Sequence, residues 1–180
     1  MQSRQPDKTR TEPTKKDPGK PVKSTKSTKS AGAGKSAQPP TAAFPKKNQP
    51  PTAAAFTARL PLSLGKRFET VRSFLLRQEG IQEDVYFYGP KTGWALRYLL
   101  GDKPLCSLLL HGDVPVGILS LNASASAVVD WKGLSSTGQL AYKNAHGSPS
   151  MLWLDVPLAG TGAGDFKAIL RAKMASLTRG

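Results

Sequence analysis

The stretch from residue 84 to residue 122, DVYFYGPKTGWALRYLLGDKPLCSLLLHGDVPVGILSLN, decides the fold. It holds four short runs rich in aromatic and branched apolar residues, and the segments between them, GPKTG, GDKP and GDVP, are typical of turns. Connections this short cannot hold a crossover helix, so we expect the four runs to form an antiparallel meander. In the second run, alternation predicts that Trp94, Leu96, Tyr98 and Leu100 face the core and that Arg97 faces the opposite side.

Helical patterns lie on both sides of this stretch. Apolar residues recur at helical spacing in LPLSLGKRFETVRSFLLRQEG (60–80), where we expect Gly80 to end the helix. After a weakly helical, glycine-interrupted connection, SMLWLDVPL (150–158) predicts a fifth strand and FKAILRAKMASL (166–177) a last helix with Asp165 as its N-cap. We expect Lys173 of that helix to lie largely toward solvent. Grouped strands and separate helices predict an α+β fold, a curved antiparallel sheet of about five strands with helices packed on one face.

The composition changes near residue 56. Residues 1–56 contain 12 basic and 3 acidic residues and no Trp, Tyr, Ile or Leu, whereas all three Trp and all four Tyr come later. A segment of this kind cannot bury enough apolar surface to offset the entropy lost on ordering. We therefore expect a disordered Lys/Pro/Ser/Thr-rich basic arm over residues 1–56 and a globular domain over residues 57–180.

The segment GAGKS (32–36) matches the end of a phosphate-binding loop motif, but the motif is incomplete. Such a loop needs a glycine five residues before the glycine that precedes its lysine. Counted back from Gly34, that position is Lys29. KSTKSTKS before it and AQPP after it do not supply the strand and the helix that hold the loop. We therefore expect no nucleotide site there, and a plain connection at the alternating glycines Gly160, Gly162 and Gly164.

The basic arm offers charge for binding a polyanion. An extended chain of this kind lays its ammonium groups along phosphates and releases counterions, which gives salt-sensitive binding with little sequence preference. The alternative is a solvating tail that contacts nothing specifically. The polyanion-binding candidates are Lys15, Lys16, Lys20, Lys23, Lys26, Lys29, Lys35, Lys46 and Lys47.

The hairpin segment and the carboxy-terminal part carry a resemblance to a known family. The residues that carry it are Tyr88, Gly89, Lys91, Gly93, Trp94, Arg97, Trp153 and Lys173. With these residues, the chain resembles, over roughly residues 62–177, the family catalogued as domain of unknown function 3788, which is similar to the small α+β domains of the YdhG-like group. The family has no established activity, so the resemblance implies a fold and leaves the function open.

Residues for metal binding and acid–base chemistry are sparse. His111 and His146 are the two histidines, and Cys106 is alone, which excludes an internal disulfide or a cysteine-based metal cluster. We expect Cys106 to be an inert buried thiol, and we expect no metal, no cofactor and no catalytic residue.

The first hairpin is the best candidate for a binding site, because aromatic and cationic side chains gather there on a sheet face away from the helices. The ligand-binding candidates are Tyr86, Tyr88, Lys91, Trp94, Arg97 and Lys173. Such a surface holds an anionic ligand or stacks bases.

Three functions follow from these observations. The first is a non-enzymatic binding or accessory protein that contacts RNA or DNA non-specifically through its arm. The first alternative is a domain or enzyme that binds a small anionic molecule at Tyr88, Lys91 and Arg97, and the second is a protein-interaction module whose sheet edge accepts a partner strand. Since no apolar run is long enough to span a membrane, we expect a soluble cytoplasmic protein, and the oligomeric state stays open.

Overall fold

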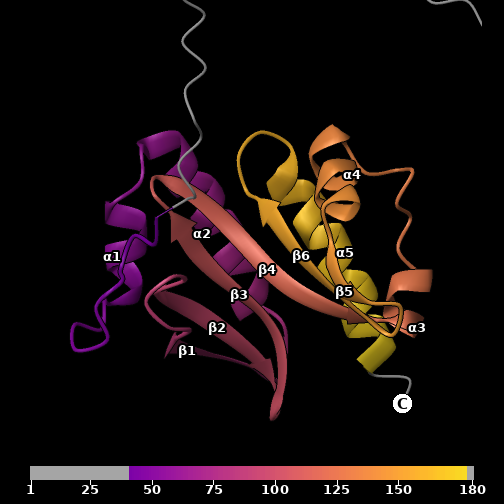
Figure 1. Ribbon diagram of the computed structural model, residues 1–180, viewed down its shortest axis with the longest axis horizontal. Coiled ribbons are helices and arrows are strands. Elements are labelled where there is room, and N and C mark those ends of the chain that lie inside the picture. Colours follow the sequence, from indigo (N-terminus) through magenta and orange to yellow (C-terminus); the bar gives the residue numbers. More distant parts are fainter. Residues whose placement is uncertain (1–40, 178–180) are drawn as a thin grey trace, which may run out of the picture. The chain divides into compact units, whose positions relative to one another are not determined.

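The computed structural model of the protein describes residues 41–177. Its elements, in chain order, are α1 (Ala53–Ala58), α2 (Leu62–Leu76), β1 (Ile81–Phe87), β2 (Trp94–Leu100), β3 (Lys103–His111), β4 (Val114–Asn122), α3 (Ala123–Ala127), α4 (Ser136–Lys143), β5 (His146–Ser148), β6 (Met151–Pro157) and α5 (Gly162–Leu177) (Figure 1).

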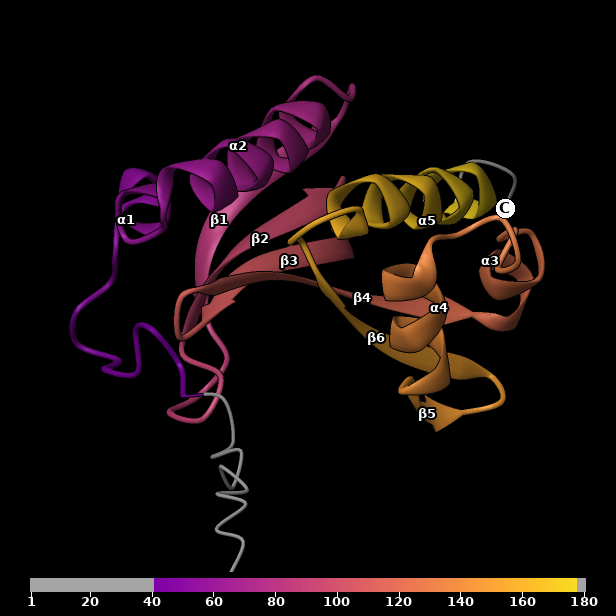
Figure 2. The same ribbon diagram turned by 90° about the horizontal axis from the view of Figure 1, so that it is seen from above.

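The strands form one antiparallel sheet in the order β1-β2-β3-β4-β6-β5. Helices α2 and α5 lie side by side on one face of this sheet (Figure 2), and α4 packs against β6 and α5. The expected α+β fold, with its antiparallel meander, is confirmed. The sheet has six strands rather than about five, because the short β5 pairs with β6 along the sheet edge.

Alternation along the strands separates the two faces of the sheet. Leu96 and Tyr98 of β2 are fully buried in the main core with Phe68 and Leu75 of α2, while Arg97 points to the other face, as expected. A smaller cluster on that other face buries Ala95, Leu109 and Val116. The sheet therefore has a helix-covered face and a second face on which charged and aromatic side chains gather.

Two helix boundaries differ from the expectation. Helix α2 ends at Leu76 with Arg77 as its C-cap, and Gly80, at a φ of +74°, forms the turn that leads into β1 instead. Helix α5 begins at Gly162, so Asp165 lies inside the helix and is not its N-cap. The buried carboxylate of Asp165 instead accepts hydrogen bonds from the main-chain N–H groups of Ser135 and Gly138, where it satisfies the start of α4.

The packed part of the chain begins earlier than residue 57. Ala42 forms a β-bridge with His111, the ring of Phe56 is fully buried, and Phe44 packs on it at a centroid distance of 4.8 Å. Composition averaged over 56 residues hides these few apolar contacts, so the expected boundary is wrong for residues 41–56. The rest of the expected arm, including GAGKS, lies outside the described residues.

Candidate functional site

Strands β3 and β4 pair over only part of their length. Their register runs from His111–Val114 to Ser107–Ile118 and goes no further. Before Ser107, β3 pairs with β2 alone, and beyond Ile118, β4 continues its pairing with β6. A bulge, where Leu105 is an extra residue opposite the Tyr98–Leu99 step, bends β3 at the same place. The two strands therefore diverge and leave an opening between them.

A pocket of about 340 Å³ lies at this opening. The residues that line it come from five strands, from the turn after β1 and from α5: Tyr86, Tyr88, Thr92, Arg97, Pro104, Leu105, Cys106, Ser107, Ile118, Leu119, Ser120, Trp153 and Lys173. Its lining is mostly apolar with a few polar groups, which is the usual make-up of a small-molecule site, and its volume is at the small end of such pockets.

Lys173 of α5 reaches into this opening from the helix-covered side. Lys173 is 7% exposed, and its Nζ donates hydrogen bonds to the main-chain oxygens of Leu105 at 2.6 Å and Pro104 at 3.3 Å. Both acceptors lie on the part of β3 that does not pair with β4. The expectation that Lys173 lies toward solvent is therefore wrong, because its amine donates to main-chain carbonyls on the segment of β3 that β4 does not cover.

The surroundings of Lys173 are neutral. No carboxylate of the described residues forms an ion pair with it, and burial lowers its pKa to about 8. The thiol of Cys106 lies in the same wall, and burial raises its pKa, so that it is uncharged at neutral pH. That Cys106 is a buried, unreactive thiol is therefore consistent with its place in the structure.

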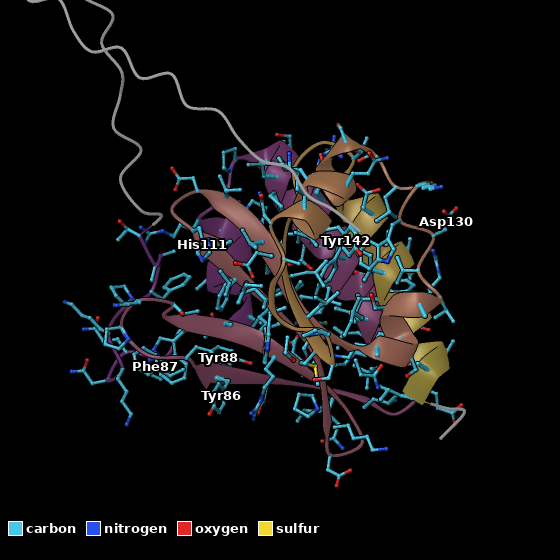
Figure 3. The ribbon with its side chains drawn as sticks, turned by 45° about the vertical axis from the view of Figure 1, so that its right-hand side comes forward. Tyr86, Phe87, Tyr88, His111, Asp130 and Tyr142 are labelled. Atoms are coloured by element: carbon cyan, nitrogen blue, oxygen red, sulfur yellow. The ribbon has the colours of Figure 1, made fainter. Side chains whose placement is uncertain are left out.

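The mouth of the pocket lies on the second face of the sheet and is aromatic and polar. Tyr86 and Tyr88 lie side by side with ring centroids 4.8 Å apart (Figure 3), and Arg97 stacks over the ring of Tyr86 at 4.0 Å. The Arg97 guanidinium is also paired with Asp84, with 3.0 Å between Nε and Oδ1. The hydroxyls of Tyr88 and Ser107 are 2.8 Å apart and form a hydrogen bond on the pocket wall.

Strands β4 and β6 supply the opposite wall. Ser120 and Trp153 are register partners on these two strands, so both side chains point to the same face as Arg97. The indole of Trp153 is 46% exposed, which is unusual for so large an apolar group. The pocket thus has tyrosines on one side of its mouth and a tryptophan on the other.

The structure brings together four of the six ligand-binding candidates. Tyr86, Tyr88, Arg97 and Lys173 line the pocket. Lys91 is exposed at the tip of the β1–β2 turn and does not line it.

Trp94 is the other candidate that lies elsewhere. It packs against Phe87 and the main core, and its indole N–H donates to the Lys46 oxygen at 2.8 Å. Cys106, Ser107 and Ser120 are lining residues that were not among the candidates. Small polar residues in apolar strands carry no strong functional signal, and only the register aligns them.

Two of the polyanion-binding candidates lie in the part of the chain that the structure describes. Lys46 and Lys47 are exposed on the loop before α1. Lys15, Lys16, Lys20, Lys23, Lys26, Lys29 and Lys35 lie outside the described residues. Binding of nucleic acid through them stays a prediction.

A second cluster of interacting charges has a structural role. Arg72 of α2 donates from Nε and Nη2 to Glu83 of β1 at 2.8 and 2.9 Å, and the Tyr98 hydroxyl donates to the same carboxylate at 2.7 Å. Burial alone raises the pKa of Glu83, but the hydrogen bonds from Arg72 and Tyr98 outweigh it and hold the pKa below its usual value. Every donor here is matched by an acceptor, so this cluster attaches α2 to the sheet and offers no free group for chemistry.

Several features are absent from residues 41–177. That part of the chain contains no group of three or more His, Cys, Asp or Glu side chains that could hold a metal ion, and none of its helices is both long and apolar enough to cross a bilayer. No protein-family model, no curated protein and no solved structure matches the chain.

Proposed function

We propose that this protein binds a small organic anion in the pocket between β3 and β4. The observation that carries the proposal is the amine of Lys173, which is buried in the pocket wall and, within residues 41–177, is hydrogen-bonded to two main-chain oxygens and to no other group. A buried ammonium without an opposite charge is costly, and an anionic ligand would remove that cost.

The charged residues that line the pocket also favour a negatively charged ligand. Arg97 and Asp84 neutralise each other, which leaves Lys173 as the unmatched cation among the described residues that line the pocket. The Nε and Nη2 atoms of Arg97 bind Asp84, and its Nη1 atom is left over for an acceptor on the ligand. A negative group would thus meet the charge of Lys173 at the wall and a hydrogen-bond donor of Arg97 at the mouth.

The apolar part of the pocket favours a ligand with a flat ring or a short hydrocarbon chain. Leu105, Ile118 and Leu119 line it, and Tyr86 and Trp153 are exposed at its mouth. Aromatic side chains that remain exposed at a concave site gain stability when a ligand covers them. A volume of about 340 Å³ suits a molecule of one or two rings.

Calorimetric titration with a matched pair of ligands tests the proposal. Naphthoate carries a carboxylate, and naphthylmethanol is its neutral counterpart of nearly the same shape. We expect the wild-type full chain to bind naphthoate at least about tenfold more tightly, since a hydrogen bond to a charged group contributes about 1.5–3 kcal/mol. This comparison needs no variant.

Two variants on α5 then locate the site. Lys173→Met is expected to abolish the preference for the anion, whereas Lys167→Met, which removes a cation from the same helix outside this pocket, keeps it. Equal binding of the two ligands by the wild type contradicts the proposal. An equal loss in both variants contradicts the assignment to Lys173.

Contact with RNA or DNA is a second proposal, carried by charge. The chain has a formal net charge of +14, and 12 of its 26 basic residues precede residue 57. Comparing the full chain with a chain that begins at residue 41 over a range of salt concentrations tests it, because counterion release makes such binding salt-dependent. Capture of a partner strand at the edges β1 and β5, and membership of the family of domain of unknown function 3788, stay predictions.

A further inference from the structure

The amine of Lys173 has two features of a reactive lysine, since it is buried and it is held in a fixed position at the wall of a pocket. Nζ lies at the end of a long, buried side chain, and two main-chain oxygens fix its position at the pocket wall. An ammonium has three N–H groups, and two of them donate to these oxygens, so one has no acceptor there. In the neutral amine, a lone pair takes the place of this third N–H group.

We propose that Lys173 is a nucleophile that forms a reversible imine with the aldehyde or ketone group of a small oxo acid held in this pocket. This inference rests on the proposed function, because it names the second functional group of the same anionic ligand. In an oxo acid, the acid group accepts from Nη1 of Arg97 at the mouth and not from Lys173, so that the carbonyl carbon faces Nζ at the wall.

The reaction is balanced without an oxidant or another co-reactant. The Nζ lone pair attacks the carbonyl carbon, the electron pair of the C=O bond moves to oxygen, and one proton passes from Nζ to that oxygen to give a carbinolamine. The hydroxyl then leaves as water with the second Nζ proton, the nitrogen electron pair forms the C=N bond, and addition of water reverses each step.

The neutral form of the amine is populated near neutral pH. With a pKa of about 8, roughly a tenth of Lys173 is unprotonated at pH 7, a few hundredfold more than for a lysine at the usual 10.5. Cys106 is the titratable group that acts on it from β3, and burial keeps that thiol neutral. The pocket residues of β4 are uncharged, and Arg97 at the mouth is paired with Asp84.

The pocket also contains hydroxyl groups for the proton transfers. The hydrogen-bonded pair of Tyr88 and Ser107 forms part of the wall, and either oxygen can donate in it. A hydroxyl pair of this kind can deliver a proton to the departing carbinolamine oxygen. The apolar residues Leu105 and Leu119 limit water around the C=N bond.

Reductive trapping of the full chain tests the inference. The probe is para-carboxybenzaldehyde, with cyanoborohydride present to convert any imine into a stable amine, and peptide mass spectrometry then gives the labelling rate of each lysine. At low probe concentration and pH 7, we expect Lys173 to be labelled at least about tenfold faster than Lys167, which lies on the same helix. The rate at Lys173 is expected to rise with pH to a midpoint near 8.

The wild-type comparison works even if a substitution at position 173 prevents folding. Lys173→Arg adds a second check, because it keeps the charge and cannot form the trapped product. Labelling of Lys173 no faster than Lys167 overturns the inference.

Naphthoate binding, measured on the same sample, separates the two claims. If naphthoate binds and Lys173 is not preferentially labelled, the imine is overturned and the anion site stands. If Lys173 is labelled quickly but para-methylbenzaldehyde labels it equally fast and naphthoate does not bind, the oxo-acid part and the proposed function are both overturned.

Discussion

Lys173 is the residue on which the site depends, and its burial links folding to pH. Its pKa is about 8 in the folded chain, against 10.5 as the ordinary value that we take for the unfolded chain. Between these values the unfolded chain binds a proton that the folded chain has released, so the free energy of unfolding increases as pH rises. Below this window both states are protonated, and the folded state bears the full cost of the buried charge.

We therefore expect the free energy of unfolding to increase by about 1 kcal/mol between pH 8 and pH 9 because of Lys173. Urea titrations at closely spaced pH values measure it. From about pH 9 upward the effect is opposed, because burial raises the pKa of Cys106 from 9.0 and that of Tyr98 from 10.0, and stability is lost as pH rises past these ordinary values.

The matched variants are again Lys173→Met and Lys167→Met. The first is expected to remove the increase between pH 8 and pH 9, and the second to retain it. If wild type and Lys173→Met show the same pH profile over this interval, the amine is not buried as a free base.

The sequence contains a signal for the burial of Lys173 that charge alone conceals. Phe166, Ile169 and Leu170, which are fully buried, precede it by seven, four and three residues, so helical spacing puts Lys173 on their stripe. A cation in such a stripe is usually assigned to solvent, since lysine is rarely buried without a partner. Its partners are carbonyls of β3, more than sixty residues away, which periodicity cannot reveal.

At the scale of elements, one glycine sets the distance between α5 and the sheet. A Cβ on Gly117 of β4 would lie 2.4 Å from Cε2 of the Phe166 ring, so the helix packs on a strand position that has no side chain. Phe166 lies two turns before Lys173 on α5, and its packing therefore fixes where the lysine enters the opening between β3 and β4.

Substituting Gly117→Ala is expected to lower the free energy of unfolding by about 1–3 kcal/mol, because the added methyl group overpacks against the ring. Gly164→Ala is the matched control on α5, since nothing lies within 4 Å of its Cβ position, and it should raise stability by up to about 1 kcal/mol. Urea denaturation measures both. Naphthoate binding should weaken in Gly117→Ala alone, and unchanged stability there would contradict the close packing of α5.

The elements of the meander were predictable because each turn is local. The divergence of β3 and β4 was not, because it depends on a bulge at Leu105 and on β6, whose residues are 29 to 41 positions away from their partners on β4. The pocket forms where these two effects meet. The sequence therefore indicated four of its lining residues without indicating the opening that brings them together.

At the scale of the whole molecule, residues 41–56 belong to the domain through contacts with the tips of the sheet. The Phe44 oxygen accepts from the Trp94 N–H at 3.1 Å, and a Cβ on Gly93 would lie 2.6 Å from that oxygen, so a glycine is required there. The Phe56 ring stacks on Phe68 of α2 at 6.2 Å. Main-chain hydrogen bonds leave no trace in composition, and the few apolar ring contacts are hidden when composition is averaged over 56 residues.

This boundary decides how the nucleic-acid proposal can be tested, because the chain must be cut without damaging the domain. A chain that begins at residue 57 lacks Phe56, and loss of one buried phenylalanine side chain destabilises a domain by about 3–5 kcal/mol, a large part of a typical total of 5–15 kcal/mol. We expect that chain to unfold at a much lower urea concentration than the full chain. A chain that begins at residue 41 keeps every contact described for residues 41–56 and is expected to match the full chain in stability.

The chain that begins at residue 41 carries 16 basic and 9 acidic residues, a net charge of +7 in place of +14. With ten basic residues removed, its affinity for a short DNA duplex at low salt is expected to fall at least about tenfold, and its salt dependence to become shallower, because fewer counterions are released on binding. Fluorescence anisotropy across a salt series measures both quantities. Equal affinity and equal salt dependence for the two chains would contradict binding through the removed residues and would direct attention to the cations of the domain, while naphthoate binding, which depends on Lys173, should be the same in both.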